Sequence, residues 1–345
     1  MQRLRGSHGR RPHVWGAACL AGLVTIGLLP SGGCLQPQSR LTLQERRQLE
    51  QRALALLLRA GQSELDVVRT HAIEALVDVA PDAGLPVFRE ALTSQSPLVR
   101  YAGCVALGET RDSASLKAVR LMLGDPDARV RLAAAFAAYR CGDTHQARVL
   151  VQMLNDHPDE KVRAEAARLI GELGEPKALK RLRLAVKRES VSYVVVHIES
   201  AMAKLGDRRS LDHLMQYALK SDAVTIVLAL QTLADLADPG TRETLEYRLH
   251  NDADYLQTRL IAARGLGRLG VDDGYKLALE SLTHAAADEN EAMQIRVNAA
   301  LALGAIGDPD ALPALRRLAE MRNDPRTQVA ASYAICQITE ALRPR

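Results

Sequence analysis

Hydrophobic and polar positions follow a helical period along most of the chain, and the same pattern recurs at a nearly constant distance. In "VRLAAAFAAYRCGD", residues 130–143, an arginine precedes two turns rich in alanine, and Gly-Asp ends the run. Equivalent positions are 69, 100, 131, 163, 195, 226, 259, 296 and 328, so successive copies are 31 to 37 residues apart. A period in this range predicts a solenoid of stacked units, each too small to bury its apolar face alone.

Each unit predicts two helices. The first carries the arginine and a pattern of alanines followed by Leu-Gly, and a Gly-Asp or Asp-Pro turn ends it. The second has apolar residues at a spacing near 3.6, such as Leu179, Leu182 and Val186, which favours helix over strand. Alanine lets neighbouring helices approach closely and costs no side-chain entropy. The alanines therefore indicate packing and not chemistry.

Three stretches carry a family resemblance: "DPDARVR" at residues 125–131, Ala299 to Pro309, and Ala311 to Leu315. They resemble HEAT repeats in their short bacterial form, the phycobilin-lyase HEAT-like repeats, over roughly residues 63–340. The resemblance implies a right-handed α-solenoid of about eight to nine two-helix repeats. It also implies that the second helices line the concave face.

The first forty residues have a different character. Arginines precede an uncharged apolar run at residues 16–29, which is shorter than the ~20 residues of a membrane span and typical of a signal peptide. Small residues then lead into Cys34, which resembles the lipobox of bacterial lipoproteins and implies lipidation of that cysteine. Ser31 stands where the family usually has leucine, so ordinary cleavage and a retained anchor stay open. The predicted domains are a lipoprotein-type signal peptide (1–33), a tether (34–40), an N-terminal capping helix (41–62) and the repeat solenoid (63–345).

Charge is neutral after the leader but unevenly spread. The formal net charge of +4 is carried by leader arginines, and residues 34–190 are net basic whereas residues 191–345 are net acidic. The solvent-facing cations of the second helices in the first four copies are Arg89, Lys117, Arg120, Arg148, Lys180 and Arg183. We call these six residues the basic ridge. They predict a concave binding surface for an acidic segment of a protein partner; scattered surface charge is the alternative.

The repeated arginine of the first helix has a structural interpretation. It occurs as Arg69, Arg100, Arg131, Arg163, Arg259 and Arg296. In the resembling arrays this residue reaches an acidic or carbonyl group of a neighbouring unit. A local pair with Asp127 or Asp159, four residues before Arg131 and Arg163, is the alternative. The longest spacing, from position 259 to 296, places extra residues near 283–292, either as a longer turn or as a binding loop.

Catalytic signatures are not found in the sequence. It contains no phosphate-binding loop, nucleophile elbow or His-Glu dipeptide, so we predict no catalytic residues, no metal site and no cofactor. His197 with Glu199, and His213, come closest to a constellation. Cys104, Cys141 and Cys336 fit small buried positions. Few aromatics and a neutral mature chain argue against a nucleic-acid partner.

The resulting hypothesis is a non-catalytic HEAT-repeat scaffold for protein–protein interaction. Its lipid anchor would hold it at the bacterial cell envelope, on the periplasmic face or the cell surface. Two alternatives remain at this stage. One is an enzyme-associated module, either a bilin-lyase-like chaperone or a relative of metal-dependent hydroxylases. The other is a HEAT-like array that binds nucleic acid.

Overall fold

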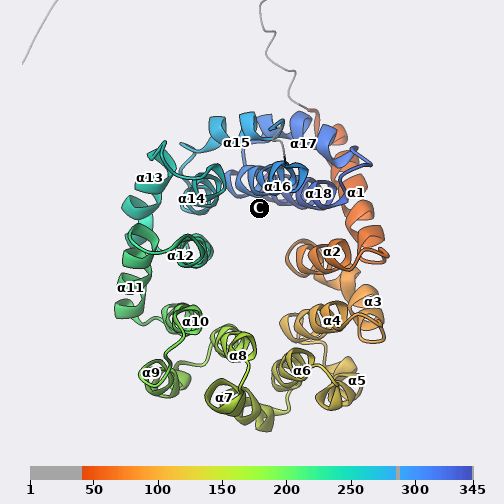
Figure 1. Ribbon diagram of the computed structural model, residues 1–345. Helices are drawn as coiled ribbons and strands as arrows, with labels where there is room; N and C mark the ends of the chain where they lie inside the picture. The colour runs from red at the N-terminus through yellow and green to blue at the C-terminus, as the bar shows by residue number, and fades with distance from the viewer. Residues whose placement is uncertain (1–40, 285–287, 344–345) are drawn as a thin grey trace, which may run out of the picture. The chain divides into compact units, whose positions relative to one another are not determined.

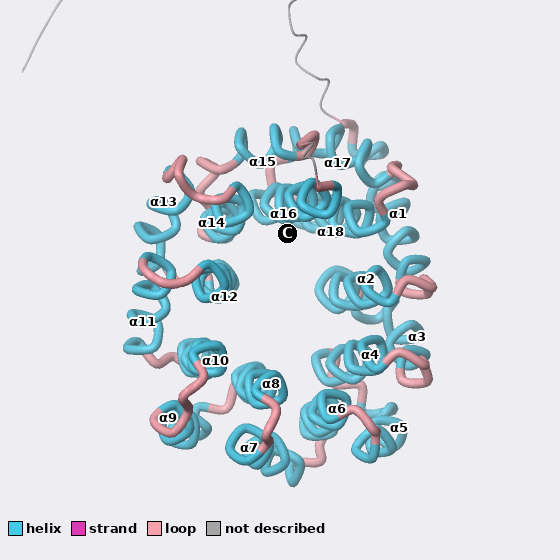
Figure 2. Tube along the Cα trace, viewed as in Figure 1, coloured by secondary structure: helices cyan, strands magenta, loops and turns pink. Residues whose placement is uncertain are grey.

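The computed structural model describes residues 41–284 and 288–343, and within them every regular element is a helix (Figure 2). The chain from Arg40 onward forms one compact unit. The predicted all-α solenoid is therefore confirmed. The predicted signal peptide, the tether and Cys34 lie outside the described residues. No helix in the described part of the chain is long and apolar enough to cross a membrane.

The helices form an inner and an outer layer (Figure 1). The even-numbered helices make the inner layer: α2 (Asp66–Val79), α4 (Pro97–Glu109), α6 (Ala128–Arg140), α8 (Glu160–Glu172), α10 (Ser192–Lys204), α12 (Ala223–Leu236), α14 (Leu256–Arg268), α16 (Glu289–Ile306) and α18 (Pro325–Ala341). The odd-numbered helices make the outer layer: α1 (Leu43–Ala60), α3 (Pro81–Ala91), α5 (Leu116–Leu121), α7 (Ala147–Asp156), α9 (Leu179–Val186), α11 (Arg208–Leu219), α13 (Arg242–His250), α15 (Tyr275–Ser281) and α17 (Leu312–Ala319). Short 3-10 turns precede several outer helices, as at Pro176–Ala178.

The two ends of this unit meet, so the repeats close into a ring (Figure 1). The last helix, α18, packs against both α1 and α2. The Tyr333 hydroxyl of α18 donates a hydrogen bond to Oδ2 of Asp78 at 2.6 Å, and Arg343 pairs with Glu50 of α1. No further helix follows α18 in the described residues, and α1 packs against α18 instead.

The inner layer is built from the alanine- and glycine-rich first helices. A Cβ added to Gly171 would lie 2.9 Å from Cα of Ala201, and one added to Gly267 would lie 2.7 Å from the backbone N of Ile306. Such close approach needs the absence of a side chain. Helices that approach closely fit the shorter, inner circumference of a curved stack. The prediction that the second helices line the concave face is therefore wrong.

Capping residues explain where the inner helices begin and end. The Asp127 carboxylate accepts hydrogen bonds from the backbone N–H groups of Arg129 and Val130 at the start of α6. Gly142, which follows α6, has a φ of 112°, a region that glycine adopts without strain. The longer spacing before Arg296 is partly absorbed by α16 itself, which begins at Glu289 and is longer than α14. Residues 285–287 of the predicted extra loop lie outside the described residues.

Candidate interaction surface

The basic ridge lies on the outer helices α3, α5, α7 and α9, not on the concave side (Figure 1). All six of its side chains are exposed. The structure therefore corrects the predicted location of the ridge, because the second helices form the outer layer. A partner that contacts these residues would lie against the outside of the ring.

Three ridge arginines form a ladder of ion pairs between successive repeats. Arg89 pairs with Asp112 at 2.8 Å, Arg120 with Asp143 at 2.9 Å, and Arg183 with Asp207 at 2.6 Å. Each aspartate belongs to the turn after the next inner helix. The hydrogen bond from Arg120 holds the pKa of Asp143 below its ordinary value. We call these three pairs the outer ladder.

The other three residues of the basic ridge form no ion pair with a described residue. Among the described residues, no acidic side chain forms an ion pair with Lys117, Arg148 or Lys180. These cations occupy equivalent positions, three residues before the ladder position of their helices. The ridge thus divides into arginines that join repeats and cations that face solvent.

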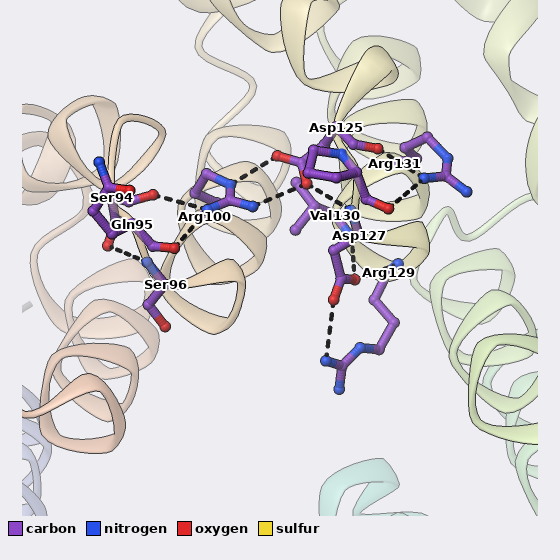
Figure 3. Close-up of polar contacts among 10 residues, drawn as sticks. Ser94, Gln95, Ser96, Arg100, Asp125, Asp127, Arg129, Val130 and Arg131 are labelled. Carbon is purple, nitrogen blue, oxygen red and sulfur yellow. Dashed lines mark hydrogen bonds and ion pairs between the residues drawn. The ribbon is translucent and has the colours of Figure 1, made fainter.

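The repeated arginines of the inner helices join the turns at the repeat boundaries (Figure 3). Arg100 donates from Nε and Nη2 to the Asp125 carboxylate at 2.7 and 3.0 Å. Its Nη1 donates to the carbonyls of Ser94 and Gln95. These bonds hold the pKa of Asp125 below its ordinary value. Arg100 therefore links the turn that precedes its helix to the turn that follows the next outer helix.

The remaining copies make related contacts. Arg163 binds Glu189 and two carbonyls, Arg296 binds Asp324 and Glu289, Arg131 binds two carbonyls, Arg259 binds Asp252 and a carbonyl, and Arg69 lies 3.6 Å from Glu90. Asp127 and Asp159 do not pair with the arginines four residues later. Their carboxylates cap the starts of α6 and α8 instead.

Several charges on the inner helices are paired with charges of neighbouring inner helices. The ion pairs are Arg140–Glu109 at 3.1 Å, Lys204–Glu172 at 2.5 Å and Arg268–Asp235 at 2.8 Å. Tyr101 of α4 also donates to Glu165 of α8, and Arg168 donates to Tyr101. Burial opposes ionisation of Glu165, but Arg168 and the hydrogen bond from Tyr101 together hold the pKa of Glu165 below its ordinary value. The sequence analysis did not find this inner network, because its members are far apart in the chain.

A groove of about 780 Å³ opens between the third and fourth repeats. Its lining includes Ala147, Arg148 and Val151 of α7, and Arg181 of α9. A smaller cavity of about 260 Å³ lies between α2, α16 and α18, where the ends of the ring meet. Only Arg148 of the groove belongs to the predicted ridge. Aligning the equivalent outer-helix positions would have shown the small residues at 147 and 151.

The structure describes the surroundings of the histidines and cysteines that the sequence analysis singled out. His213 lies 3.0 Å from Glu199, whereas His197 packs edge-on against the Tyr193 ring. No group of three potential metal ligands is found among the described residues. Burial raises the pKa of the Cys104 thiol to about 12, so this thiol stays protonated at neutral pH.

Comparison with known proteins agrees with the repeat architecture. The sequence matches the family model for HEAT repeats over residues 49–140, 147–234 and 242–336. A search of curated proteins found no match. The fold is similar to the complex of CpcE and CpcF of phycocyanin lyase from Nostoc sp., with 18% identity over 79% of this chain and 98% of that chain and a TM-score of 0.41. It is also similar to human deoxyhypusine hydroxylase in complex with glycerol, with 18% identity, 77% and 99% coverage, and a TM-score of 0.37.

The fold and the paired arginines define a helical-repeat solenoid. The chain belongs to the HEAT-repeat family. Arrays of this kind present extended surfaces that bind other proteins.

Proposed function

We propose that this protein is a non-catalytic HEAT-repeat scaffold that binds a protein partner through the outside of its ring. The partner presents an acidic segment to the cations of α5, α7 and α9. A lipid on Cys34 anchors the scaffold to the bacterial cell envelope, facing the periplasm or the outside. The observation that carries the binding proposal is the row of unpaired cations Lys117, Arg148 and Lys180.

These cations contrast with the ladder arginines of the same outer helices. The arginines three residues further along α5 and α9 are each paired with an aspartate. Like charges repeated at one position on stacked helices repel one another, and an acidic partner relieves that repulsion. The row lies on helices of the outer layer (Figure 1), and its side chains are exposed.

The test is capture of partners from membranes by the tagged full-length protein. The variant carries Lys117→Glu and Lys180→Glu, and a matched control carries Arg52→Glu and Arg317→Glu on the outer helices α1 and α17. We expect a protein retained by the wild type and the control to be lost by the variant. Binding should also weaken as salt rises, because exposed charges are screened. Equal retention by the variant and the control would exclude the basic outer face as the binding surface.

A further inference from the structure

We propose that the groove between the third and fourth repeats is the docking site for an acidic peptide segment that carries apolar side chains. The inference rests on the proposed function and names where the partner's segment binds. The groove is lined by apolar groups from α7 and α8 and by cations from α7, from the turn after α8 and from α9. Its volume of about 780 Å³ falls in the range of ~300–1,000 Å³ typical of ligand sites.

Two small residues open the groove. Ala147 occupies a position held by leucine in the neighbouring outer helices, as Leu116 and Leu179. Val151 occupies the outer-ladder position held by Arg120 and Arg183. The outer ladder therefore joins the second repeat to the third and the fourth to the fifth, but it is interrupted between the third and the fourth. The groove lies at this interruption.

The acid that would complete the missing ladder pair is engaged elsewhere. Glu175 accepts a hydrogen bond from the Tyr139 hydroxyl at 2.8 Å and lies 3.3 Å from Lys177. These bonds, the one from Tyr139 being the larger effect, hold the pKa of Glu175 below its ordinary value, so it stays ionised. Arg148 and Arg181 pair with no acidic side chain of the described residues. Three cations against one carboxylate leave the groove positively charged.

Apolar surface accompanies this charge. Ile170 and Leu173 of the α8 region contribute to the lining together with Val151. On the neighbouring outer helices, Leu121 of α5 is 71% exposed and Leu184 of α9, three residues after Arg181, is 49% exposed. A purely acidic ligand would leave these groups in contact with water. An acidic segment with leucine-like side chains satisfies both the cations and the apolar surface.

The experiment restores the repeat pattern and so fills the groove. The full-length variant carries Ala147→Leu and Val151→Arg, the residues found at the neighbouring repeats. The new arginine adds positive charge, so loss of binding cannot come from weaker electrostatic attraction. The probe is a fluorescent peptide of two leucines flanked by glutamates, and a second peptide replaces both leucines with serine. Fluorescence anisotropy measures the affinity, and thermal unfolding monitors the fold.

We expect the leucine peptide to bind the wild type, and the serine peptide and the filled variant each to show affinity weakened by at least about tenfold. The filled variant should unfold at the same temperature or higher, because it gains an ion pair with Glu175. Arg148→Gln with Arg181→Gln should also weaken binding, without filling the groove. Equal affinity for the wild type and the filled variant would overturn the proposed site. If the filled variant binds the leucine peptide normally while the Lys117→Glu, Lys180→Glu variant fails to capture the partner, the groove proposal fails and the scaffold proposal stands.

A peptide that fails to bind the wild type would overturn the docking site directly. Anionic lipid vesicles provide the second arm. The vesicles could bind the wild type but not the filled variant, while the leucine peptide binds neither protein. In that case the groove recognises lipid headgroups and the peptide proposal is wrong.

Discussion

Replacing Gly267 with alanine tests why the first helices form the inner layer. Gly267 of α14 faces α16, where an added Cβ would lie 2.7 Å from the backbone N of Ile306 and 2.9 Å from the carbonyl carbon of Ala305. Both neighbours are backbone atoms of another helix, so rotation of a side chain cannot relieve the contact. The two helices must separate, and the closed ring resists that separation because α18 is held against α1 and α2.

The expected effect is a balance of two terms. Overpacking costs about 1–3 kcal/mol. Alanine recovers up to about 1 kcal/mol because it favours helix over glycine. We therefore expect Gly267→Ala to lower the free energy of unfolding by about 1–2 kcal/mol. For a folded unit of this size that corresponds to roughly 1.5–3 °C in the melting temperature.

Gly124 provides the matched control, because a Cβ added there meets no atom within 4 Å. Its φ is not positive, so alanine fits the backbone without strain. Gly124→Ala should raise stability by about 0.4–1 kcal/mol through the lower entropy of the unfolded chain. Thermal unfolding of both full-length variants, followed by circular dichroism, measures the difference. If Gly267→Ala stabilises the protein as much as Gly124→Ala does, the backbones of α14 and α16 are not in contact, and the packing explanation of the ring fails.

Two further predictions concern the ion pairs between repeats and the membrane anchor. Asp125→Asn should cost about 1.5–3 kcal/mol at neutral pH, because the buried carboxylate accepts two bonds from Arg100. The lowered pKa of Asp125 means that the unfolded chain binds more protons, so its contribution to stability is present above the ordinary value of 3.8 and is lost as the pH falls through the folded pKa. The melting temperatures of wild type and variant should converge in acid, and a constant difference down to low pH would contradict the role of this pair. Cys34→Ser should release the protein from the membrane fraction or leave an unprocessed precursor, and membrane retention with normal processing, seen by fractionation and mass spectrometry, would exclude lipidation.

The sequence by itself determined the repeat, its two helices and the turns between them. Hydrophobic period, alanine content and Gly-Asp turns are local signals, and the structure places two helices in each repeat at those positions. The family followed from the same signals. The repeated arginines could also be located by spacing, and most of them lie in the first turn of an inner helix. Their acidic partners in the following turn, such as Asp125 for Arg100, were not specified by any local motif.

Only the tertiary structure decided which layer faces inward, that the ends meet, and which cations stay unpaired. The alanines and glycines of the first helices already indicated close packing. The direction of curvature, however, depends on how the distance between successive first helices compares with the distance between successive second helices. Small rotations at each repeat add up around the array, so closure of α18 onto α1 is a property of the whole stack. The same holds for charge: Arg120 and Lys117 look alike in sequence, yet only Arg120 reaches an aspartate of the next repeat. The sequence specifies which side chains are cationic. Whether a cation is paired with a carboxylate depends on which side chains of the neighbouring repeat lie within reach.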